Sequence, residues 1–369
     1  MRLRHPDGSL LHLAYCSNVH PADDLDGVSA QLERYAARVR ERLGVDTLGV
    51  GLWVAAPALA DHDAAERLHA QLRRLRLEVV TLNGFPYTAF HAPVVKLGVY
   101  SPDWTDPARR EYTVGLARLL ARLLPEDVED GSISTLPLGW REGWDERAQG
   151  AALAALHDVA TELERLHEES GKRIRLALEP EPGCTVETIA QACAVLEDLA
   201  PEWIGVCLDA CHLAVQFETA QEATTLTQDA GVPIVKAQIS SALRVEPHEH
   251  ALLDRYTEPK FLHQVRERVN GHVAGVDDLP QAGELPGERE WRVHFHVPVH
   301  TATNTTQDEL VDTLRALVGG HTPLTRHLEV ETYTWSVMAD DDETLIEGLA
   351  SELEWTRDQI VALGAEVLA

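Results

Sequence analysis

The chain alternates short apolar runs with longer stretches in which apolar residues recur every three or four positions. Short runs of this kind predict buried strands, and the longer stretches predict amphipathic helices. The predicted strands cover residues 10–16, 47–54, 77–82, 132–138, 174–179, 204–209, 234–238 and 328–334. The predicted helices cover residues 23–43, 61–75, 108–124, 151–167, 185–199, 218–229, 306–317 and 342–363. Repeated strand–helix units favour an α/β fold, a (β/α)8 TIM barrel that spans residues 1–369 as one domain.

Residues 245–300 interrupt this pattern between the seventh and eighth predicted strands. Within them, residues 252–269 predict a helix, a Gly-, Pro- and Asp-rich stretch at 271–287 favours a loop or hairpin, and an alternating run at 291–297 predicts a strand. The helix that follows opens with Thr-Gln-Asp-Glu from residue 306, which predicts a capping box. We expect this insertion to lie on the C-terminal face of the barrel, which holds the active site in this fold.

Several apolar runs in the predicted strands stop at an oxygen-bearing side chain. Those residues are Glu179, Asp209, Gln238 and Glu331, and the first three are separated by 30 and 29 positions. Because the C-terminal ends of the strands converge on one face of a barrel, we expect these four side chains to meet. Four oxygen ligands predict a site for a divalent cation such as Mn²⁺ or Mg²⁺, and nearby histidines would shift the preference toward Zn²⁺, Co²⁺ or Fe²⁺.

Side-chain alternation ranks the acids on two of these strands. The small Ala177 shares a face with Glu179, which places both toward the crowded barrel interior. Glu329 and Glu331 also share a face, and Glu331 lies nearer the strand tip. We therefore expect Glu331 to be the ligand, and Glu329 to pair with Arg175 or another basic group deeper in the barrel. The alternative for each isolated acid is a solvent-facing loop position.

Histidines stand close to the expected site. His212 follows the second predicted ligand by three residues, and His294, His296 and His300 lie in or just after the last strand of the insertion. Alternation puts His294 and His296 on one face. We favour His296 as the histidine that reaches the pocket, to bind substrate or to complete the metal coordination. Structural histidines are the alternative, and the sequence leaves the roles of His294, His300 and Glu181 open.

Composition narrows the classes of function. The chain has 32 basic and 60 acidic residues, a net charge of −28, which makes it a poor candidate for binding nucleic acid. No apolar stretch approaches the ~18 residues that a membrane span needs, and the N-terminal residues predict a first strand rather than a signal peptide. Five cysteines without paired spacing favour free thiols in a reducing compartment, so we expect a cytoplasmic protein.

The residues at the predicted strand tips resemble those of the xylose isomerase-like TIM barrel superfamily of sugar isomerases and epimerases. In the ketose 3-epimerases of that group the metal ligands are Glu, Asp, His and Glu. The matching residues are Glu179 in LALEPEPG, Asp209 in LDACH and Glu331 in LEVET. Gln238 stands where that group has the histidine. The resemblance implies that His212 and Arg244 contact the substrate.

The whole chain more closely resembles the EboE family of metabolite traffic proteins from the bacterial ebo gene cluster. The stretches that carry this resemblance are YCSNVHP (15–21), LNGFPY (82–87), STLPLGW (134–140), EPEPGC (179–184), CLDACH (207–212), HFHVPV (294–299) and LEVETYTW (328–335). The resemblance implies that the protein handles a small precursor metabolite and has a functional link to the other proteins of that cluster.

Three functions compete at this stage. The leading hypothesis is a metal-dependent isomerase or epimerase of a sugar-like or polyol-like metabolite. Glu179 and Glu331 would move a proton beside a carbonyl that the metal polarises, while His212, Arg244 and His296 would orient the substrate. The alternatives are a hydrolase, in which the histidines add ligands for a second ion, and a non-catalytic carrier. The sequence leaves open the substrate, the identity and number of the metal ions, and whether the chain forms a homo-oligomer.

Overall fold

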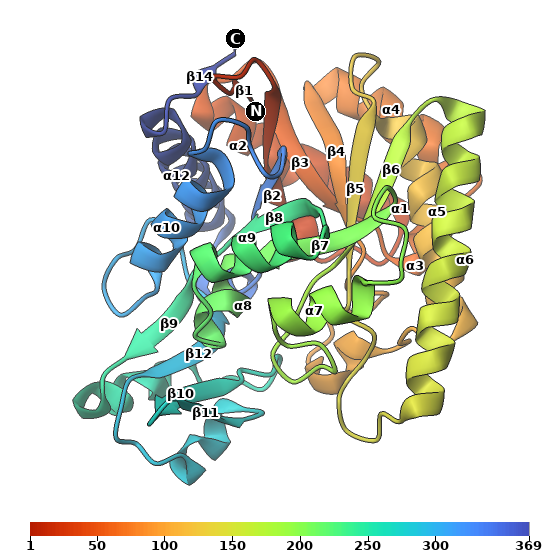
Figure 1. Ribbon diagram of the computed structural model, residues 1–369. Helices are drawn as coiled ribbons and strands as arrows, with labels where there is room; N and C mark the ends of the chain where they lie inside the picture. Colours follow the sequence, from red (N-terminus) through yellow and green to blue (C-terminus); the bar gives the residue numbers. More distant parts are fainter. Residues whose placement is uncertain (369) are drawn as a thin grey trace.

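A closed barrel of eight parallel strands forms the centre of the molecule, in a computed structural model that describes residues 1–368 (Figure 1). Each strand pairs in parallel with the next barrel strand along the chain, and β13 closes the barrel by pairing with β2. The barrel strands are β2 (Leu10–Cys16), β3 (Leu48–Trp53), β4 (Leu77–Asn83), β5 (Asp130–Thr135), β6 (Arg173–Leu178), β7 (Ile204–Asp209), β8 (Ile234–Ile239) and β13 (His327–Val330). The predicted (β/α)8 barrel is confirmed.

Helices surround the barrel and bury its outward-facing side chains. The longer ones are α1 (Leu25–Gln31), which continues through a π turn (Leu32–Ala36) into α2 (Ala37–Leu43), then α4 (Ala64–Leu75), α5 (Pro107–Leu123), α6 (Glu146–Ser170), α7 (Ile189–Leu196), α9 (Ala220–Asp229), α10 (Gln307–Val318) and α12 (Asp342–Ala362). Three short helices follow strand tips: α3 (Ala56–Leu59), α8 (Ala210–Val215) and α11 (Trp335–Met338). Among the residues described, no helix combines the length and apolar character that crossing a membrane requires.

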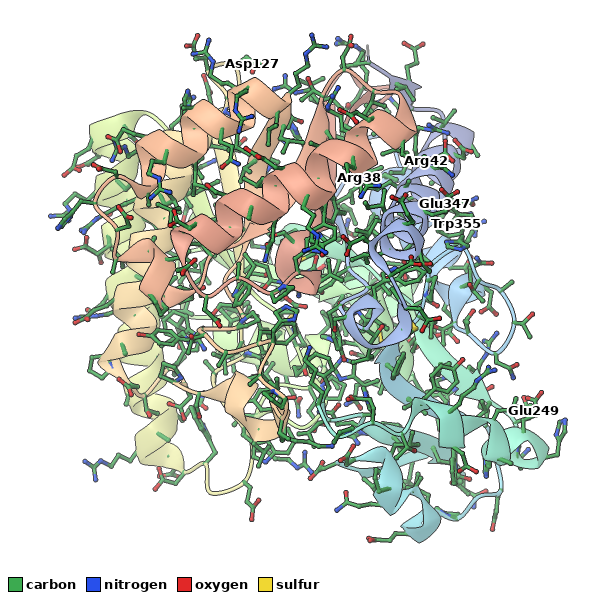
Figure 2. The ribbon with its side chains drawn as sticks, turned by 180° about the vertical axis from the view of Figure 1, so that it is seen from behind. Arg38, Arg42, Asp127, Glu249, Glu347 and Trp355 are labelled. Carbon is green, nitrogen blue, oxygen red and sulfur yellow. The ribbon has the colours of Figure 1, made fainter. Side chains whose placement is uncertain are left out.

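The first and last helices of the barrel pack against each other. Seen from behind, α2 and α12 lie next to each other, with Arg42 ion-paired to Glu347 and Arg38 to Glu343 (Figure 2). At the adjoining end of the barrel, β1 (Arg2–Arg4) pairs antiparallel with both β2 and β14 (Glu366–Val367). The two chain ends therefore meet at the N-terminal end of the barrel strands, away from the strand tips.

The inside of the barrel is polar. Lys236 on β8 and Glu329 on β13 form an ion pair in which neither side chain is exposed. A basic partner for Glu329 was predicted, either Arg175 or another residue deeper in the barrel. The structure shows that this partner is Lys236 and not Arg175. Gly51 on β3 leaves room for this pair, because a Cβ atom added there would lie only 2.0 Å from a Glu329 carboxylate oxygen. With the Glu329 side chain in this place, only glycine fits at position 51.

A separate antiparallel sheet interrupts the barrel after β8. Its strands pair in the order β11-β10-β12-β9. The bounds are β9 (Ala242–Val245), β10 (Val265–Val269), β11 (His272–Val276) and β12 (Trp291–His296), and short 3-10 turns cover Pro247–Tyr256 and Leu279–Glu284. We call it the small sheet. Figure 1 places it at the end of the molecule opposite the chain termini.

The helix predicted over residues 252–269 is wrong. That segment holds a 3-10 turn and then β10, which forms a hairpin with β11 through Asn270 and Gly271. Both turn residues have positive φ, 51° and 81°, the backbone that a two-residue hairpin turn requires and that Asn-Gly favours. The Asn-Gly signal therefore outweighs the apolar spacing on which the helix prediction rested.

The helix predicted from residue 306 is present, but its predicted capping box is wrong. The Thr306 side chain makes no capping bond to α10. Its hydroxyl instead accepts a hydrogen bond from the backbone N–H of Ala242, at 2.9 Å. Thr306 therefore fixes the start of β9 against α10, a long-range contact that the local sequence pattern does not reveal.

Candidate metal centre

Three carboxylates meet at the C-terminal tips of the barrel strands. Glu179 follows β6, Asp209 ends β7, and Glu331 follows β13. One carboxylate oxygen from each lies within 4.8 Å of the others, and all three side chains are buried. Gln238 on β8 is in register with Asp209 on the neighbouring strand β7 and with Glu329 on its other neighbour, β13. The structure therefore brings together the strand tips on which the four predicted ligands stand.

The electrostatics of this cluster disfavour three free negative charges. Burial first, and then the neighbouring carboxylates, hold the pKa values of Glu179 and Glu331 well above the usual range for glutamate. Two amides fix the orientation of Glu331: the side chains of Asn18 and Asn83 donate to its Oε1 oxygen at 2.6 and 3.0 Å. The cluster is thus a set of buried carboxylates whose charges a proton or a cation would stabilise.

Several buried atoms of this centre lack a hydrogen-bond partner among the described residues. They are Oε2 of Glu179, Oδ2 of Asp209, both side-chain amide atoms of Gln238 and Nε2 of His296. Buried polar atoms are nearly always paired, so five unpaired atoms in one region indicate a missing positively charged or hydrogen-bonding group. Carboxylate and amide oxygens with one imidazole suit a divalent cation. The residues present therefore fit a metal ion held by Glu179, Asp209 and Glu331.

A pocket opens over the carboxylates. Glu179 and Glu331 line it from the barrel, and the aromatic rings of Phe85, Phe90 and Tyr333 line it from the loops after β4 and β13. The segment that leads into β10 contributes Phe261. Barrel loops and the small sheet together therefore enclose a pocket with an acidic base and aromatic walls.

Three histidine rings form one side of this pocket. Asp209 caps α8 by accepting from the His212 backbone N–H at 2.9 Å, which holds the His212 ring beside the strand tip. His294 and His296 reach the same pocket from β12. Burial is the main cause that lowers the pKa of His294 well below its usual range and that of His296 to about 4. Both rings of β12 are therefore neutral at physiological pH.

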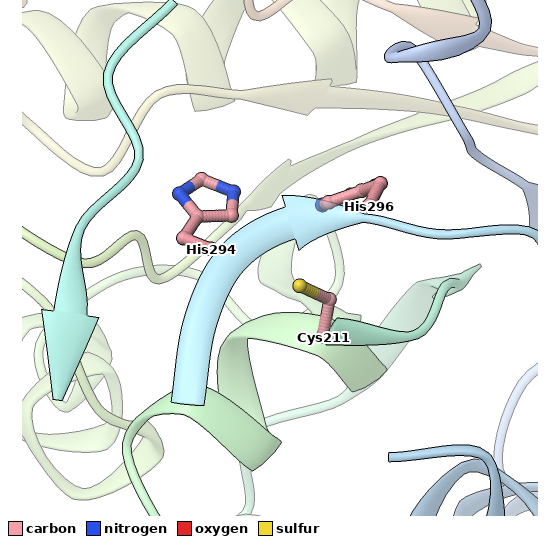
Figure 3. A group of neighbouring side chains, drawn as sticks. All are labelled: Cys211, His294 and His296. Carbon is pink, nitrogen blue, oxygen red and sulfur yellow. The ribbon is translucent and has the colours of Figure 1, made fainter. Parts of the chain in front are cut away.

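Two further polar groups border the histidines. Glu181 lies with Oε2 at 3.1 Å from Nε2 of His212, and burial raises its pKa to about 7. Figure 3 shows Cys211 on α8 directed toward β12, which carries His294 and His296. Burial holds the pKa of the Cys211 thiol well above its usual range, so this side chain is a neutral thiol at physiological pH. Glu181, to which the sequence assigned no role, is one of the residues that line the pocket.

Two of the predicted residues lie apart from the pocket. Arg244 stands on β9, where its guanidinium pairs with Asp308 at 3.0 Å and Glu309 at 3.6 Å near the start of α10. It does not line the pocket, and its bonds account for its position. His300 is exposed in the turn after β12. The small sheet therefore contributes His294 and His296 to the site, and not these two residues.

Several residues that the structure places in the site have no role predicted from the sequence. Asn18 and Asn83, which hold Glu331, follow or end β2 and β4. Their position at strand tips is a usable signal, because it is the same signal that pointed to the carboxylates. Tyr100 and Gln264 are different: they come from a 3-10 turn and from the segment before β10, and both contact the histidine side of the pocket. Nothing in their local sequence marks them.

Comparison with known proteins agrees with this architecture. The sequence model of the xylose isomerase-like TIM barrel family matches residues 37–270. No curated protein matches the chain.

Solved structures share the fold at low sequence identity. The IolI protein with a bound zinc atom superposes with a TM-score of 0.54 at 14% identity, over 96% of this chain and 99% of that one. The probable 3-DHS dehydratase AsbF from Bacillus anthracis gives 0.51 at 12% identity, over 93% and 98%. An L-ribulose 3-epimerase gives 0.50 at 15% identity, over 96% and 98%. At these identities the likeness establishes the fold alone.

Proposed function

The chain belongs to the xylose isomerase-like TIM barrel family, and we propose that it is a divalent-metal-dependent isomerase or epimerase of a sugar-like or polyol-like metabolite. The observation that carries the proposal is the meeting of Glu179, Asp209 and Glu331 at the strand tips, where Glu179 and Glu331 line the pocket. A cation bound there would polarise a substrate carbonyl and stabilise the negative charge that develops on its oxygen. Two fold neighbours, described as a zinc-bound IolI protein and an L-ribulose 3-epimerase, are compatible with such chemistry.

Glu179 and Glu331 are the proposed proton-transfer groups. Both line the pocket, so a substrate carbon can approach them. Burial and the neighbouring carboxylates raise the pKa values of both groups, which makes each carboxylate a stronger base toward a carbon beside a carbonyl. Asn18 and Asn83 both donate to Oε1 of Glu331, so this carboxylate keeps a fixed orientation while its Oε2 takes no part in those bonds.

The pocket walls favour a substrate with one polar face and one apolar face. Phe85, Phe90 and Phe261 present aromatic rings above the carboxylates, and the C–H face of a sugar or polyol chain packs well against such rings. Hydroxyl and carbonyl oxygens of the same molecule would then face the acidic base. His212 and His296 also line the pocket, and they would hydrogen-bond these oxygens and so select the bound orientation.

We extend the proposal to membership of the EboE family of metabolite traffic proteins. The support comes from where its characteristic stretches lie in the fold. YCSNVHP supplies Asn18, LNGFPY supplies Asn83 and Phe85, and HFHVPV supplies His294 and His296, all of which line one pocket. A family resemblance whose motifs gather around one pocket is best explained by a shared small-molecule ligand.

Two other functions would use the same residues. Hydrolysis is favoured by the gathering of Glu181, His212 and His294 beside the carboxylates, since two adjacent ions can activate water. A non-catalytic carrier is favoured by Gln238, because a neutral amide is a weaker ligand than histidine. The products of a single experiment separate these functions from isomerisation.

Hydrogen exchange at carbon tests the proposal. The protein, loaded with Mn²⁺, is incubated in D₂O with a panel of ketoses and hydroxyketones, and proton NMR follows the carbon beside the carbonyl. We expect deuterium uptake into at least one substrate, with a loss of about 10²–10⁴-fold in Glu179→Gln and Glu331→Gln. Glu347→Gln, on the exposed face of α12, is the matched control and should exchange normally. Binding without exchange would indicate a carrier, and cleavage products would indicate a hydrolase.

A further inference from the structure

We propose that the hydroxyl of Tyr333 donates a hydrogen bond to a hydroxyl oxygen of the substrate, and that Tyr333 thereby selects among polyhydroxylated ligands. Tyr333 follows β13, two residues after Glu331, and its side chain lines the pocket. The inference rests on the proposed function for the class of ligand, a sugar-like or polyol-like molecule. It adds the residue that recognises one hydroxyl of that molecule.

The Tyr333 hydroxyl is an exception among the buried tyrosines. The other four buried tyrosines pair their hydroxyls with protein groups: Tyr15 with His20, Tyr35 with Asp342, Tyr100 with Glu181, and Tyr112 with the carbonyls of Val54 and Pro86. Tyr333 is only 8% exposed, and among residues 1–368 its hydroxyl has no hydrogen-bond partner. Because a buried tyrosine hydroxyl usually has a partner, the missing one indicates a ligand atom.

The unpaired hydroxyl borders open space. The fully enclosed polar atoms that lack a partner include Oε2 of Glu179 and Nε2 of His296, but not the hydroxyl of Tyr333. An unpaired hydroxyl that is not fully enclosed is accessible, and the pocket is the space that Tyr333 lines. A tyrosine ordinarily keeps its proton up to about pH 10, and burial raises the pKa of Tyr333 further. The pocket therefore contains a neutral hydroxyl that can donate.

Aromatic contacts from separate segments fix the Tyr333 ring. The ring meets those of Phe261 and Phe90 edge-on, with centroids 4.9 and 5.9 Å away. The ring of His296 on β12 lies 4.8 Å from it. The next residue, Thr334, donates to the backbone carbonyl of His296 and so anchors the adjoining backbone. Because the ring is held before a ligand arrives, its hydroxyl favours ligands whose acceptor already lies in the right place.

Tyr333 supplies what the neighbouring polar groups do not. The carboxylates of the pocket accept hydrogen bonds, and the amides of Asn18 and Asn83 already donate to Glu331. The ammonium of Lys96, which also lines the pocket, is engaged in an ion pair. A polyol chain has hydroxyl hydrogens, which suit the carboxylates, and hydroxyl oxygens, which need a donor. The Tyr333 hydroxyl is such a donor.

The expected consequence is selectivity for a ligand that carries a hydroxyl at one particular carbon. A ligand with that hydroxyl gains one neutral hydrogen bond, worth about 3–10-fold in affinity. A ligand without it leaves the Tyr333 hydroxyl buried and unpaired, so it loses the same factor. A packing role for the tyrosine would instead affect all ligands of similar size alike.

Matched deletions on the protein and on the ligand test the inference. Calorimetry measures the binding of L-erythrulose, D-xylulose and D-fructose to the Mn²⁺-loaded protein, and then of the monodeoxy derivatives of the ketose that binds best. Tyr333→Phe removes only the hydroxyl and should bind that ketose about 3–10-fold more weakly. One monodeoxy derivative should bind the wild type equally weakly, and should bind Tyr333→Phe no more weakly than the parent ketose does.

A matched control guards the interpretation. Tyr35→Phe also loses a buried hydroxyl, one that bonds Asp342 rather than lining the pocket, and should bind each ketose as the wild type does. Tyr333→Phe should keep the wild-type affinity for Mn²⁺, which shows that the carboxylate centre is intact. The inference is overturned if Tyr333→Phe binds every ketose as tightly as the wild type. It is also overturned if the variant weakens the parent ketose and all its monodeoxy derivatives by the same factor.

The same experiment distinguishes this inference from the proposed function. A wild type that binds a ketose without exchanging its hydrogen in D₂O would contradict isomerisation, while the affinities of Tyr333→Phe would still decide the role of the hydroxyl. Normal hydrogen exchange together with unchanged binding in Tyr333→Phe would contradict this inference alone. A wild type that binds none of the three ketoses would overturn the inference, because the class of ligand that it names would be wrong.

Discussion

The Nδ1 nitrogen of His296 lies 2.8 Å from the backbone carbonyl oxygen of Glu331, so a histidine of the small sheet is fixed against the tip of barrel strand β13. Because the carbonyl accepts, Nδ1 carries the hydrogen, and the unpaired Nε2 lies 4.0 Å from Oδ2 of Asp209. The hydroxyl of Thr334 donates in return to the backbone carbonyl of His296. The small sheet and the barrel thus position the carboxylate centre together.

This contact predicts a role for His296 in metal affinity. In His296→Ala, the carboxylate site should bind Mn²⁺ about 10–100-fold more weakly, the size of effect typical when a group that supports metal ligands is lost. Isothermal titration calorimetry measures the affinity. His300→Ala is the matched control, because that histidine is exposed in the adjoining turn. Equal affinities in the two variants would show that His296 serves packing alone.

A buried carboxylate behind the site joins the same two segments. Oε1 of Glu352 on α12 accepts from the backbone N–H of Val299 at 3.1 Å and from the hydroxyl of Thr332 at 2.5 Å. Its Oε2 accepts from the indole N–H of Trp335 at 2.7 Å. Val299 follows β12 and Thr332 follows Glu331, so Glu352 holds the ends of both segments. Burial nevertheless raises the pKa of Glu352 to about 7.

The raised pKa predicts a pH-dependent stability. Between the ordinary glutamate pKa of 4.5 and about 7, the folded state keeps a proton on Glu352 that the unfolded state has released. Stability therefore falls as the pH rises through this window, by up to about 3 kcal/mol from this group. Urea unfolding at pH 5 and pH 8 measures the difference. Glu352→Gln should reduce this difference, whereas Glu354→Gln, on the exposed face of α12, should leave it unchanged. An equal difference between pH 5 and pH 8 in the two variants would contradict the assignment.

Strand ends were predictable from the sequence because each barrel unit repeats the same local pattern. Glu179, Asp209 and Glu331 stand where apolar runs stop, and the parallel register brings such positions to one face. The pairing of Glu329 was only half predictable. Alternation places its side chain inside the barrel, but whether Arg175 or Lys236 meets it depends on the tilt of strands that are far apart in the sequence.

The small sheet and the histidine side of the pocket were less predictable. Residues 265–269 read equally as a strand or as part of a helix, and pairing with β12 decides the outcome. His212 and His294 are 82 positions apart, and no local pattern indicates that their rings meet. The amides of Asn18 and Gln264 act through similarly distant contacts. Tertiary contacts, rather than propensity, therefore set this half of the site.

The ion pair inside the barrel predicts a strong and specific loss of stability. Lys236→Met leaves the Glu329 carboxylate buried and unpaired, which should lower the free energy of unfolding by about 3–5 kcal/mol. Adding Glu329→Gln removes the uncompensated charge, so the double variant should recover much of the loss. Guanidinium unfolding of both variants measures these values. A double variant no more stable than Lys236→Met would mean that the lysine acts through packing rather than through its charge.

The carboxylate centre predicts that one substitution raises the stability of the metal-free protein and removes its response to metal. Glu179, Asp209 and Glu331 repel one another when no cation is bound, and burial adds to the cost of their charges. Glu179→Gln keeps the shape of the side chain but removes the cost of burying this carboxylate, whether it is charged or holds a proton at pH 8. At pH 8 without metal, this variant should therefore melt at a higher temperature than the wild type.

Added Mg²⁺ should reverse that order, because an ion that binds only the folded state stabilises it by about 4 kcal/mol at a thousand times its dissociation constant. The wild type should gain most of this amount and Glu179→Gln little of it. Mg²⁺ is the ion of choice here, since it prefers the oxygen ligands of this site over the histidines nearby. Differential scanning calorimetry of both proteins, with and without Mg²⁺, provides the four melting temperatures. The assignment of the site fails if Glu179→Gln melts lower than the wild type without metal and still responds fully to Mg²⁺, because Glu179 would then contribute to packing and not to the binding of the ion.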